Sequence, residues 1–96
     1  MLQYSPNQKI LAAKNVLIQE LAGQSVLLNL QTEEYFGLDD VGTRMWETLI
    51  EKESIGITID SLLDEYEGVE SAQLQQDLEN LIEELLANGL VEISDS

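Results

Sequence analysis

The chain has 96 residues, of which 19 are acidic and four are lysine or arginine, so its net charge is −15. This length is typical of one domain with one modest core. We expect residues 1–96 to form a single domain, with a loose lead at residues 1–8 and a loose tail at 94–96. The negative charge argues against nucleic acid and anionic membranes as partners, because proteins meet such polyanions with lysine and arginine.

The acidic residues are distributed unevenly along the chain. Residues 1–30 contain two lysines and one glutamate, a net charge of +1, whereas residues 31–96 contain eighteen acids, one arginine and one lysine, a net charge of −16. With 44% hydrophobic residues, the chain is nevertheless too apolar to be disordered. The acidic excess therefore belongs to the part of the chain after residue 30.

The chain contains no cysteine and no histidine. Disulfides, thiolate nucleophiles, zinc sites and the usual general base near pH 7 are therefore excluded, and we expect no metal and no cofactor. No stretch approaches the roughly 20 apolar residues of a membrane span, and the first residues lack the pattern of a secretory signal. The sequence predicts a cytoplasmic protein.

The first third of the chain is predicted to form strands, because it is rich in β-branched and apolar residues between short polar turns. The expected strands cover residues 15–21, 25–30 and 35–38. Val26, Leu28 and Leu30 recur at every second position, which predicts that they share one face of the middle strand. The three segments are expected to pair as an antiparallel meander.

Three helices are expected in the rest of the chain, each with an apolar stripe at helical spacing. Asp39 or Asp40 caps the first, because a carboxylate accepts the unpaired N–H groups of a first turn. Thr58 is expected to cap the second, after an interruption at residues 54–57, and Ser71 to cap the third. The stripes contain Met45, Trp46, Leu49 and Ile50, then Ile59, Leu62, Leu63 and Tyr66, then Leu74, Leu78, Leu81, Ile82 and Leu85.

A strand meander followed by three helices around one core is an α+β arrangement. The short second helix and the long third helix resemble a helix-turn-helix pair with a strand wing in front. The predicted fold is therefore winged-helix-like, with a three-stranded antiparallel meander followed by three helices. Residues 90–93 form either a short closing strand or a packed tail. The net charge excludes the DNA binding that is usual for this shape.

Carboxylates are the most abundant reactive side chains, and Asp77, Glu79, Glu83 and Glu84 lie close together on the third expected helix. A catalytic pair needs two acids at a fixed separation in a desolvated cleft, whereas a solvated helix face explains these residues more simply. No calcium-loop pattern is present. The sequence therefore favours a protein without enzymatic activity.

The tripeptide Asp60-Ser61-Leu62 resembles the attachment signature of acyl carrier proteins, in which a serine at the start of a helix carries phosphopantetheine. Such carriers are four-helix bundles, which leave no place for the strand-rich residues 15–38. A capped helix start explains the tripeptide more simply. The carrier hypothesis remains the less favoured alternative.

The third strand, with Tyr35, Phe36 and Gly37, has no strand-like segment directly after it, so it is expected to be a sheet edge. An edge strand presents unpaired N–H and C=O groups, to which another chain can add as a further strand. If the third helix packs beside it, the two form a groove. Protection of the edge by Glu33 and Glu34 is the competing interpretation, and the pattern does not decide between them.

Two motifs resemble those of the PqqD-like family. Residues 32–39 match its T-x-x-Y-[YF]-x-L-[ND] turn and strand, and residues 42–49 match its G-x-x-[IM]-W-x-x-[IL] helix. The apolar run at 74–85, followed by Gly89-Leu90-Val91, is similar to the family's third helix and its G-L-[LV] ending. The resemblance covers about residues 10–93 and consists of apolar and turn positions rather than a catalytic signature.

The resemblance implies a RiPP recognition element, a winged-helix-like domain that binds the leader part of a ribosomally made precursor peptide and presents it to modifying enzymes. In the family, the leader adds as a strand to the third strand of the meander and lies against the third helix. Carried over, the peptide-binding residues are Glu34, Tyr35, Phe36, Gly37, Leu38, Leu74, Asp77, Leu78 and Leu81.

A chain of this size looks like the recognition subunit of lasso-peptide clusters, which works with a separate leader peptidase and a macrolactam-forming synthetase. The related alternative is a partner of a radical SAM enzyme, as in pyrroloquinoline quinone assembly. The acids begin at the turn that leads into the expected binding strand. This placement favours a basic or neutral peptide and faster association at low salt.

Overall fold

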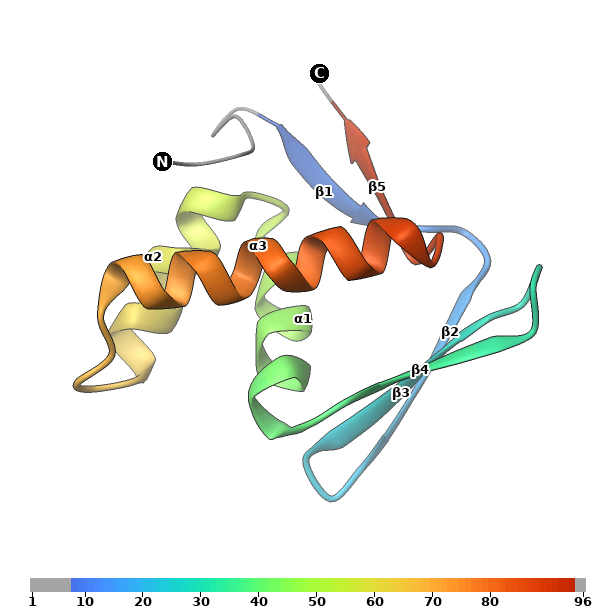
Figure 1. Ribbon diagram of the computed structural model, residues 1–96, viewed down its shortest axis with the longest axis horizontal. Helices are drawn as coiled ribbons and strands as arrows, with labels where there is room; N and C mark the ends of the chain where they lie inside the picture. Colours follow the sequence, from blue (N-terminus) through green and yellow to red (C-terminus); the bar gives the residue numbers. More distant parts are fainter. Residues whose placement is uncertain (1–7, 95–96) are drawn as a thin grey trace.

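The computed structural model describes residues 8–94 and is shown in Figure 1. Two small antiparallel sheets and three helices surround one core. The elements in chain order are β1 (Lys9–Ala12), β2 (Val16–Leu21), β3 (Gln24–Asn29), β4 (Glu34–Leu38), α1 (Asp40–Lys52), α2 (Ile55–Glu65), α3 (Ser71–Ala87) and β5 (Val91–Ser94). The structure thus confirms the α+β, winged-helix-like arrangement of a three-stranded meander followed by three helices.

The meander is an antiparallel sheet with the order β2-β3-β4. In its register, Leu28 lies opposite Leu17 on one side and Tyr35 on the other, while Leu27 lies opposite Phe36. Because side chains alternate between the two faces of a strand, this register fixes which residues face the helices. β2 and β4 are the two edges of this sheet.

The regularly spaced leucines and valine of β3 lie on the outer face of the sheet and not in the core. Val26 is 40% exposed and Leu30, just after the strand, is 55% exposed, whereas Ser25, Leu27 and Asn29 are buried. Polar pairing explains why the regularly spaced residues face outward. The hydroxyls of Ser25 and Thr43 form a buried hydrogen bond of 2.7 Å between β3 and α1, so a polar residue satisfies its hydrogen bond on the inner face.

Asn29 connects the sheet to the end of α3. Its Oδ1 accepts hydrogen bonds from Asn15 Nδ2 at 2.7 Å and from the backbone N–H groups of Gln31 and Thr32. Its Nδ2 donates to the carbonyl of Asn88 at 2.8 Å. One buried side chain therefore fixes the β3–β4 turn and the position of α3 over the sheet.

A second sheet pairs β1 with β5, and Ile10 N–H donates to the carbonyl of Glu53 at 3.0 Å. Of the two alternatives for residues 90–93, a closing strand or a packed tail, the structure has the strand, and it extends to Ser94, which was expected in the loose tail. β1 was not predicted from the sequence, because four residues are too few to show a period. Of the expected lead, residues 1–7 lie outside the described residues, as do tail residues 95–96.

The first helix begins as predicted. Asp39 is the N-cap of α1, and its carboxylate accepts a hydrogen bond from Gly42 N–H at 2.8 Å. A Cβ at Gly42 would lie 3.2 Å from both Asp39 Oδ1 and a methyl carbon of Leu38, so this position favours glycine. The turn between β4 and α1 is thereby held tightly.

The expected caps of the other two helices were wrong. Helix α2 is capped by Ser54, whose hydroxyl accepts from Ile57 N–H at 3.2 Å, so residues 54–57 belong to its first turn. Thr58 is instead wholly buried inside the helix, and Ser61 lies in its middle. Helix α3 has Glu70 at its N-cap position, and Ser71 is its first helical residue. Tertiary packing, which brings Ile55 into the core, decides where α2 begins.

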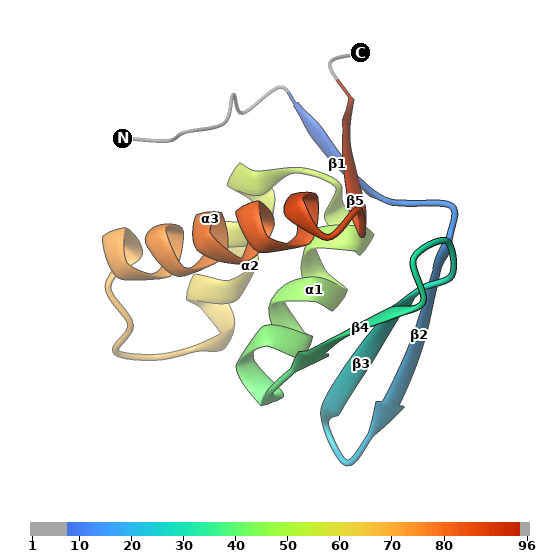
Figure 2. The same cartoon turned by 45° about the vertical axis from the view of Figure 1, so that its right-hand side comes forward.

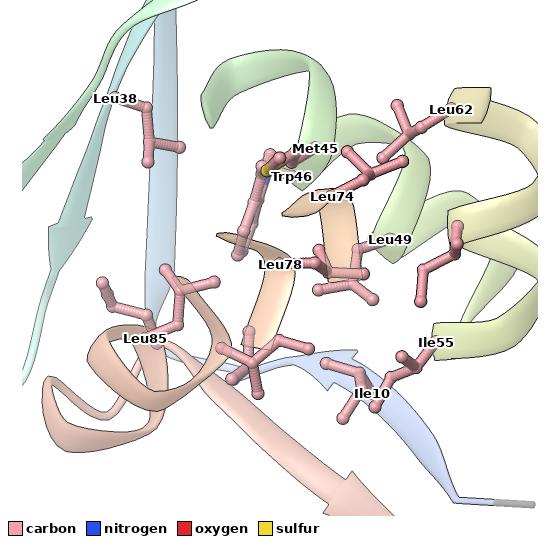
Figure 3. Packing of buried hydrophobic residues seen from close by; sticks show 14 of the residues in the cluster. Ile10, Leu38, Met45, Trp46, Leu49, Ile55, Leu62, Leu74, Leu78 and Leu85 are labelled. Atoms are coloured by element: carbon pink, nitrogen blue, oxygen red, sulfur yellow. The ribbon is translucent and has the colours of Figure 1, made fainter. Parts of the chain in front are cut away.

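The core lies between the three helices and extends to β3 and β1. Leu49, Leu62, Leu78 and Leu85 are wholly buried, and Trp46 is nearly so. Figure 3 shows these side chains pointing toward one another from α1, α2 and α3. Figures 1 and 2 show α3 running across the molecule from α2 to the β1–β5 ribbon, with α1 and the meander beneath it.

Candidate peptide-binding groove

The strand β4 is the open edge of the meander. It pairs with β3 on one side, and within residues 8–94 no strand pairs with its other side. Tyr35 is 72% exposed, and a Cβ added at Gly37 would meet no atom within 4 Å. The backbone of β4 is therefore accessible to an incoming strand, and only Glu34 at its beginning carries a charge.

The side chains of β4 divide between two faces. Phe36 and Leu38 point toward the core, where Leu38 is buried and Phe36 is half-buried against the hydrophobic cluster. Tyr35 and Gly37 belong to the outer face. The Leu38 carbonyl also accepts a 3.4 Å hydrogen bond from Thr43 Oγ1, which anchors this end of the strand to α1.

Two hollows lie between this region and α3. One, of about 460 Å³, lies at the Glu34 end, between the β3–β4 turn and the last turn of α3 near Leu86 and Asn88. The other, of about 260 Å³, lies past the Leu38 end, between the first turns of α1 and the middle of α3. A peptide added along β4 would therefore have a recess at each end of its path.

The four α3 residues expected in the groove lie in two different environments. Leu74 and Leu78 are buried in the core, and Leu78 is 0% exposed. Their side chains therefore hold α3 in place by packing in the core. Asp77 and Leu81 do line the second hollow.

Two further residues of the hollow, Asn80 and Glu84, were missed by the sequence reasoning. With Asp77 and Leu81 they follow i, i+3, i+4, i+7 spacing, so one stripe of the helix contains all four. The same spacing from Asp77 identifies them in the sequence, whereas the leucine spacing leads to the core.

The only arginine of the chain, Arg44, forms an ion pair with Glu65 of α2. Arg44 Nε donates to both carboxylate oxygens of Glu65 at 2.9 and 2.8 Å, and Arg44 Nη2 lies 2.8 Å from Glu65 Oε1. Hydrogen bonding to Arg44 holds the pKa of the Glu65 carboxyl below its usual value, and the same contact raises the pKa of Arg44. This ion pair connects α1 to α2.

A second carboxylate contact joins β2 to α1. Hydrogen bonding to Glu47 and the negative charge of that residue raise the pKa of Glu20. Two acids in this proximity repel each other when both are ionised. Glu47 Oε1 also lies 3.6 Å from Arg44 Nη1, so an opposite charge offsets part of this repulsion.

Nothing in the geometry of the described part suggests a catalytic or metal centre. Within residues 8–94, no group of three or more acids is placed to hold a metal ion. Glu79 is buried while Glu83 and Glu84 are exposed, so these acids do not share a cleft. Ser61 is half-buried in mid-helix, and the fold is not the four-helix bundle of acyl carriers. None of the described helices has the length and apolar character needed to cross a membrane.

The fold and the groove together define a winged-helix-like α+β domain with an open strand edge beside a long helix. The chain belongs to the PqqD family, because the family model described as coenzyme PQQ synthesis protein D matches residues 24–91. The match includes the meander from β3 onward and all three helices. No curated protein matches the chain.

Two solved structures are similar to this chain. One is the structure of TbiB1 in complex with the TbiA(beta) leader peptide, with a TM-score of 0.79. The two sequences are 33% identical, and the match covers 85% of this chain and 94% of that one. A lasso peptide synthetase B1, complexed with the leader peptide, shares the fold with a TM-score of 0.77, covering 88% of this chain and 98% of that one at 24% identity.

Proposed function

We propose that this protein is a non-catalytic adaptor that binds the leader region of a ribosomally synthesised precursor peptide and presents it to maturation enzymes. The observation that carries the proposal is the open edge of β4 beside α3. The likeness to TbiB1, which was solved with a leader peptide and is 33% identical, supports the same kind of ligand.

The leader adds as a strand to β4, where its backbone pairs with the unpaired edge of residues 34–38. Main-chain hydrogen bonds supply affinity, and pockets for alternate side chains supply specificity. Phe36 and Leu81 offer half-buried apolar surface to the leader, and Asp77 offers an acceptor. Leu74 and Leu78 contribute by holding α3 in place.

The partner enzymes of this proposal are a leader peptidase and a macrolactam-forming synthetase of lasso-peptide assembly. The outer face of the meander is suited to such an enzyme, because it carries no charged side chain in a protein of net charge −15. An uncharged apolar patch of this kind marks an interaction site. By the strand register, its residues are Leu17, Gln19, Leu21, Gln24, Val26, Leu28, Tyr35 and Gly37.

The alternative is a peptide chaperone for a radical SAM enzyme, which the match to the coenzyme PQQ synthesis family favours. Neighbouring reading frames distinguish the two pathways. A transglutaminase-like peptidase and an asparagine-synthetase-like enzyme beside a short precursor would support the lasso assignment. A radical SAM enzyme in their place would support the alternative.

An NMR titration tests leader binding directly. Isotope-labelled protein is titrated with the TbiA(beta) leader peptide, and a scrambled peptide of the same composition is the control. We expect the largest amide shifts at residues 34–38 and 77–84, with none for the scrambled peptide. No shift, or shifts confined to α2, would overturn the proposal.

Strand addition itself is tested with N-methylated leader peptides. In an added strand, alternate backbone N–H groups face the partner strand. Methylation of those N–H groups should abolish binding, and methylation of the intervening ones should leave the affinity nearly unchanged. An even loss along the peptide would contradict pairing with β4.

A further inference from the structure

The hollow between α1 and α3 has a composition that distinguishes it from the rest of the groove. It adjoins the Leu38 end of β4, because Asp39 follows that strand directly and forms part of its wall. The wall consists of Asp39, Val41, Gly42, Met45, Asp77, Asn80, Leu81 and Glu84. A strand added to β4 therefore brings one of its side chains to this hollow.

The inner part of the hollow is apolar. Met45 is buried, Leu81 is half-buried, and Val41 leaves about half of its surface (49%) exposed beside them. The long side chains of lysine and arginine bury their methylene stems along such surfaces while their charged ends stay at the rim. The apolar wall thus suits an aliphatic stem better than a compact polar group.

The rim of the hollow is acidic. Asp39 Oδ1 is held by Gly42 N–H at 2.8 Å, and Asp77 Oδ1 is held by Gln73 Nε2 at 2.9 Å. These hydrogen bonds orient both carboxylates, and each retains a second oxygen that can accept from a ligand. Glu84 adds a third carboxylate from the next turn of α3.

No cation of the described chain neutralises this rim. The hollow has no lysine or arginine in its wall, and Arg44 is paired with Glu65 on the α2 side. The three acids are also not grouped as a metal site within residues 8–94. A cation on a flexible stem can meet one rim carboxylate while its stem stays on the apolar wall.

We propose that this hollow is a side-chain pocket of the peptide groove that selects lysine or arginine in the bound peptide. The aliphatic stem packs against Val41, Met45 and Leu81, and the charged end reaches one of the rim carboxylates, that of Asp77 or that of Glu84. This inference rests on the proposed function and specifies part of its substrate: a leader with a basic residue where it passes the start of α1.

A positional series of peptides tests the pocket. Each position of the TbiA(beta) leader peptide is replaced in turn by lysine, by norleucine, which keeps the stem without the charge, and by glutamate. Affinities are measured by competition in fluorescence anisotropy. We expect one position at which lysine binds about fivefold more tightly than norleucine, the scale of a partly exposed ion pair, and glutamate binds most weakly.

Matched double variants locate the effect. In Asp77→Asn/Glu84→Gln, the lysine preference at that position should fall below about twofold, because two of the carboxylates are neutralised. In Asp60→Asn/Glu83→Gln, which changes the net charge equally at exposed sites outside the hollow, the preference should persist. Circular dichroism verifies the fold of both variants.

Three outcomes would overturn the inference. Equal affinity of lysine and norleucine at every position would refute the pocket and leave leader binding intact. Equal loss of the preference in both double variants would assign it to net charge rather than to this hollow. Failure of every peptide in the series to bind would refute both the pocket and the proposed function.

Discussion

Asn29 Nδ2 donates a hydrogen bond of 2.8 Å to the carbonyl of Asn88, across 59 positions of sequence. This contact joins the last residue of β3 to the C-cap of α3. Because β4 pairs with β3 and leaves the turn that Asn29 organises, the same contact sets the separation of β4 and α3. One buried amide therefore determines the width of the groove at its Glu34 end.

Replacing Asn29 by alanine should lower both stability and leader affinity. The substitution leaves the Asn88 carbonyl and the turn N–H groups without their partner, which costs about 1–3 kcal/mol of unfolding free energy. Urea denaturation measures the stability, and anisotropy at a temperature where the variant is folded measures the affinity. Gln31→Ala, at an exposed position of the same turn, is the control; a similar loss there would argue against the role of Asn29.

Truncation of Leu78 should destabilise the fold far more than truncation of Leu81. Leu78 is wholly buried, so Leu78→Ala removes core packing and should cost about 2–5 kcal/mol. Leu81 is half-buried on the groove side, so Leu81→Ala should cost about 1 kcal/mol while reducing leader affinity. Thermal unfolding and peptide binding are measured for both. A folded Leu78→Ala protein of normal stability would remove Leu78 from the core.

The start of α2 can be tested with two hydroxyl residues. Ser54→Ala removes the N-cap and should lower the unfolding free energy by about 1 kcal/mol. Thr58 Oγ1 is buried and has no hydrogen-bond partner within residues 8–94, so the isosteric Thr58→Val should be neutral or slightly stabilising. If Thr58→Val were the more destabilising change, the helix would begin at Thr58 after all.

The Arg44–Glu65 pair should give stability that depends on pH. The pKa of Glu65 is lowered in the folded protein, so its contribution is present above the ordinary carboxyl value of 4.5 and is lost as the pH falls through the lower folded value. Both side chains are about 40% exposed, which limits the contribution to roughly 0.2–1 kcal/mol. Glu65→Gln should therefore be less stable than the natural protein at pH 7, with a difference that disappears in acid. Chemical denaturation at both pH values measures it, and a difference that grows in acid would contradict the assignment.

Local sequence patterns predicted most of the fold. The strand segments at 15–21, 25–30 and 35–38 and the apolar stripes of the helices are repeated over enough residues to identify each element. The cap at Asp39 was predictable because its hydrogen bond spans three residues. The edge strand β4 was predictable because it is the last strand-like segment before the helices.

Side-chain direction was not predictable to the same degree. Leu74, Leu78 and Leu81 belong to one apolar stripe in the sequence, yet the first two lie in the core and the third lies at the groove. At the edge of an apolar stripe, a residue can be buried while one about a position further round the helix is exposed. Only the packing of α3 on α1 decides whether a given residue at this edge faces the core or the groove. Asn29 is a further example, because two of its four partners, Asn15 and Asn88, are distant in the sequence and meet it only in the fold.

The sequence by itself determined the fold class, the edge strand and the sign of the charge around it, because composition, period-two segments and helical stripes are properties of contiguous residues. The tertiary structure decided which side of the meander faces the helices, where α2 begins, and which acids of α3 border the groove. These features depend on contacts between residues far apart in the chain. The burial of Ser25 against Thr43, and with it the outward direction of Val26, results from such a contact.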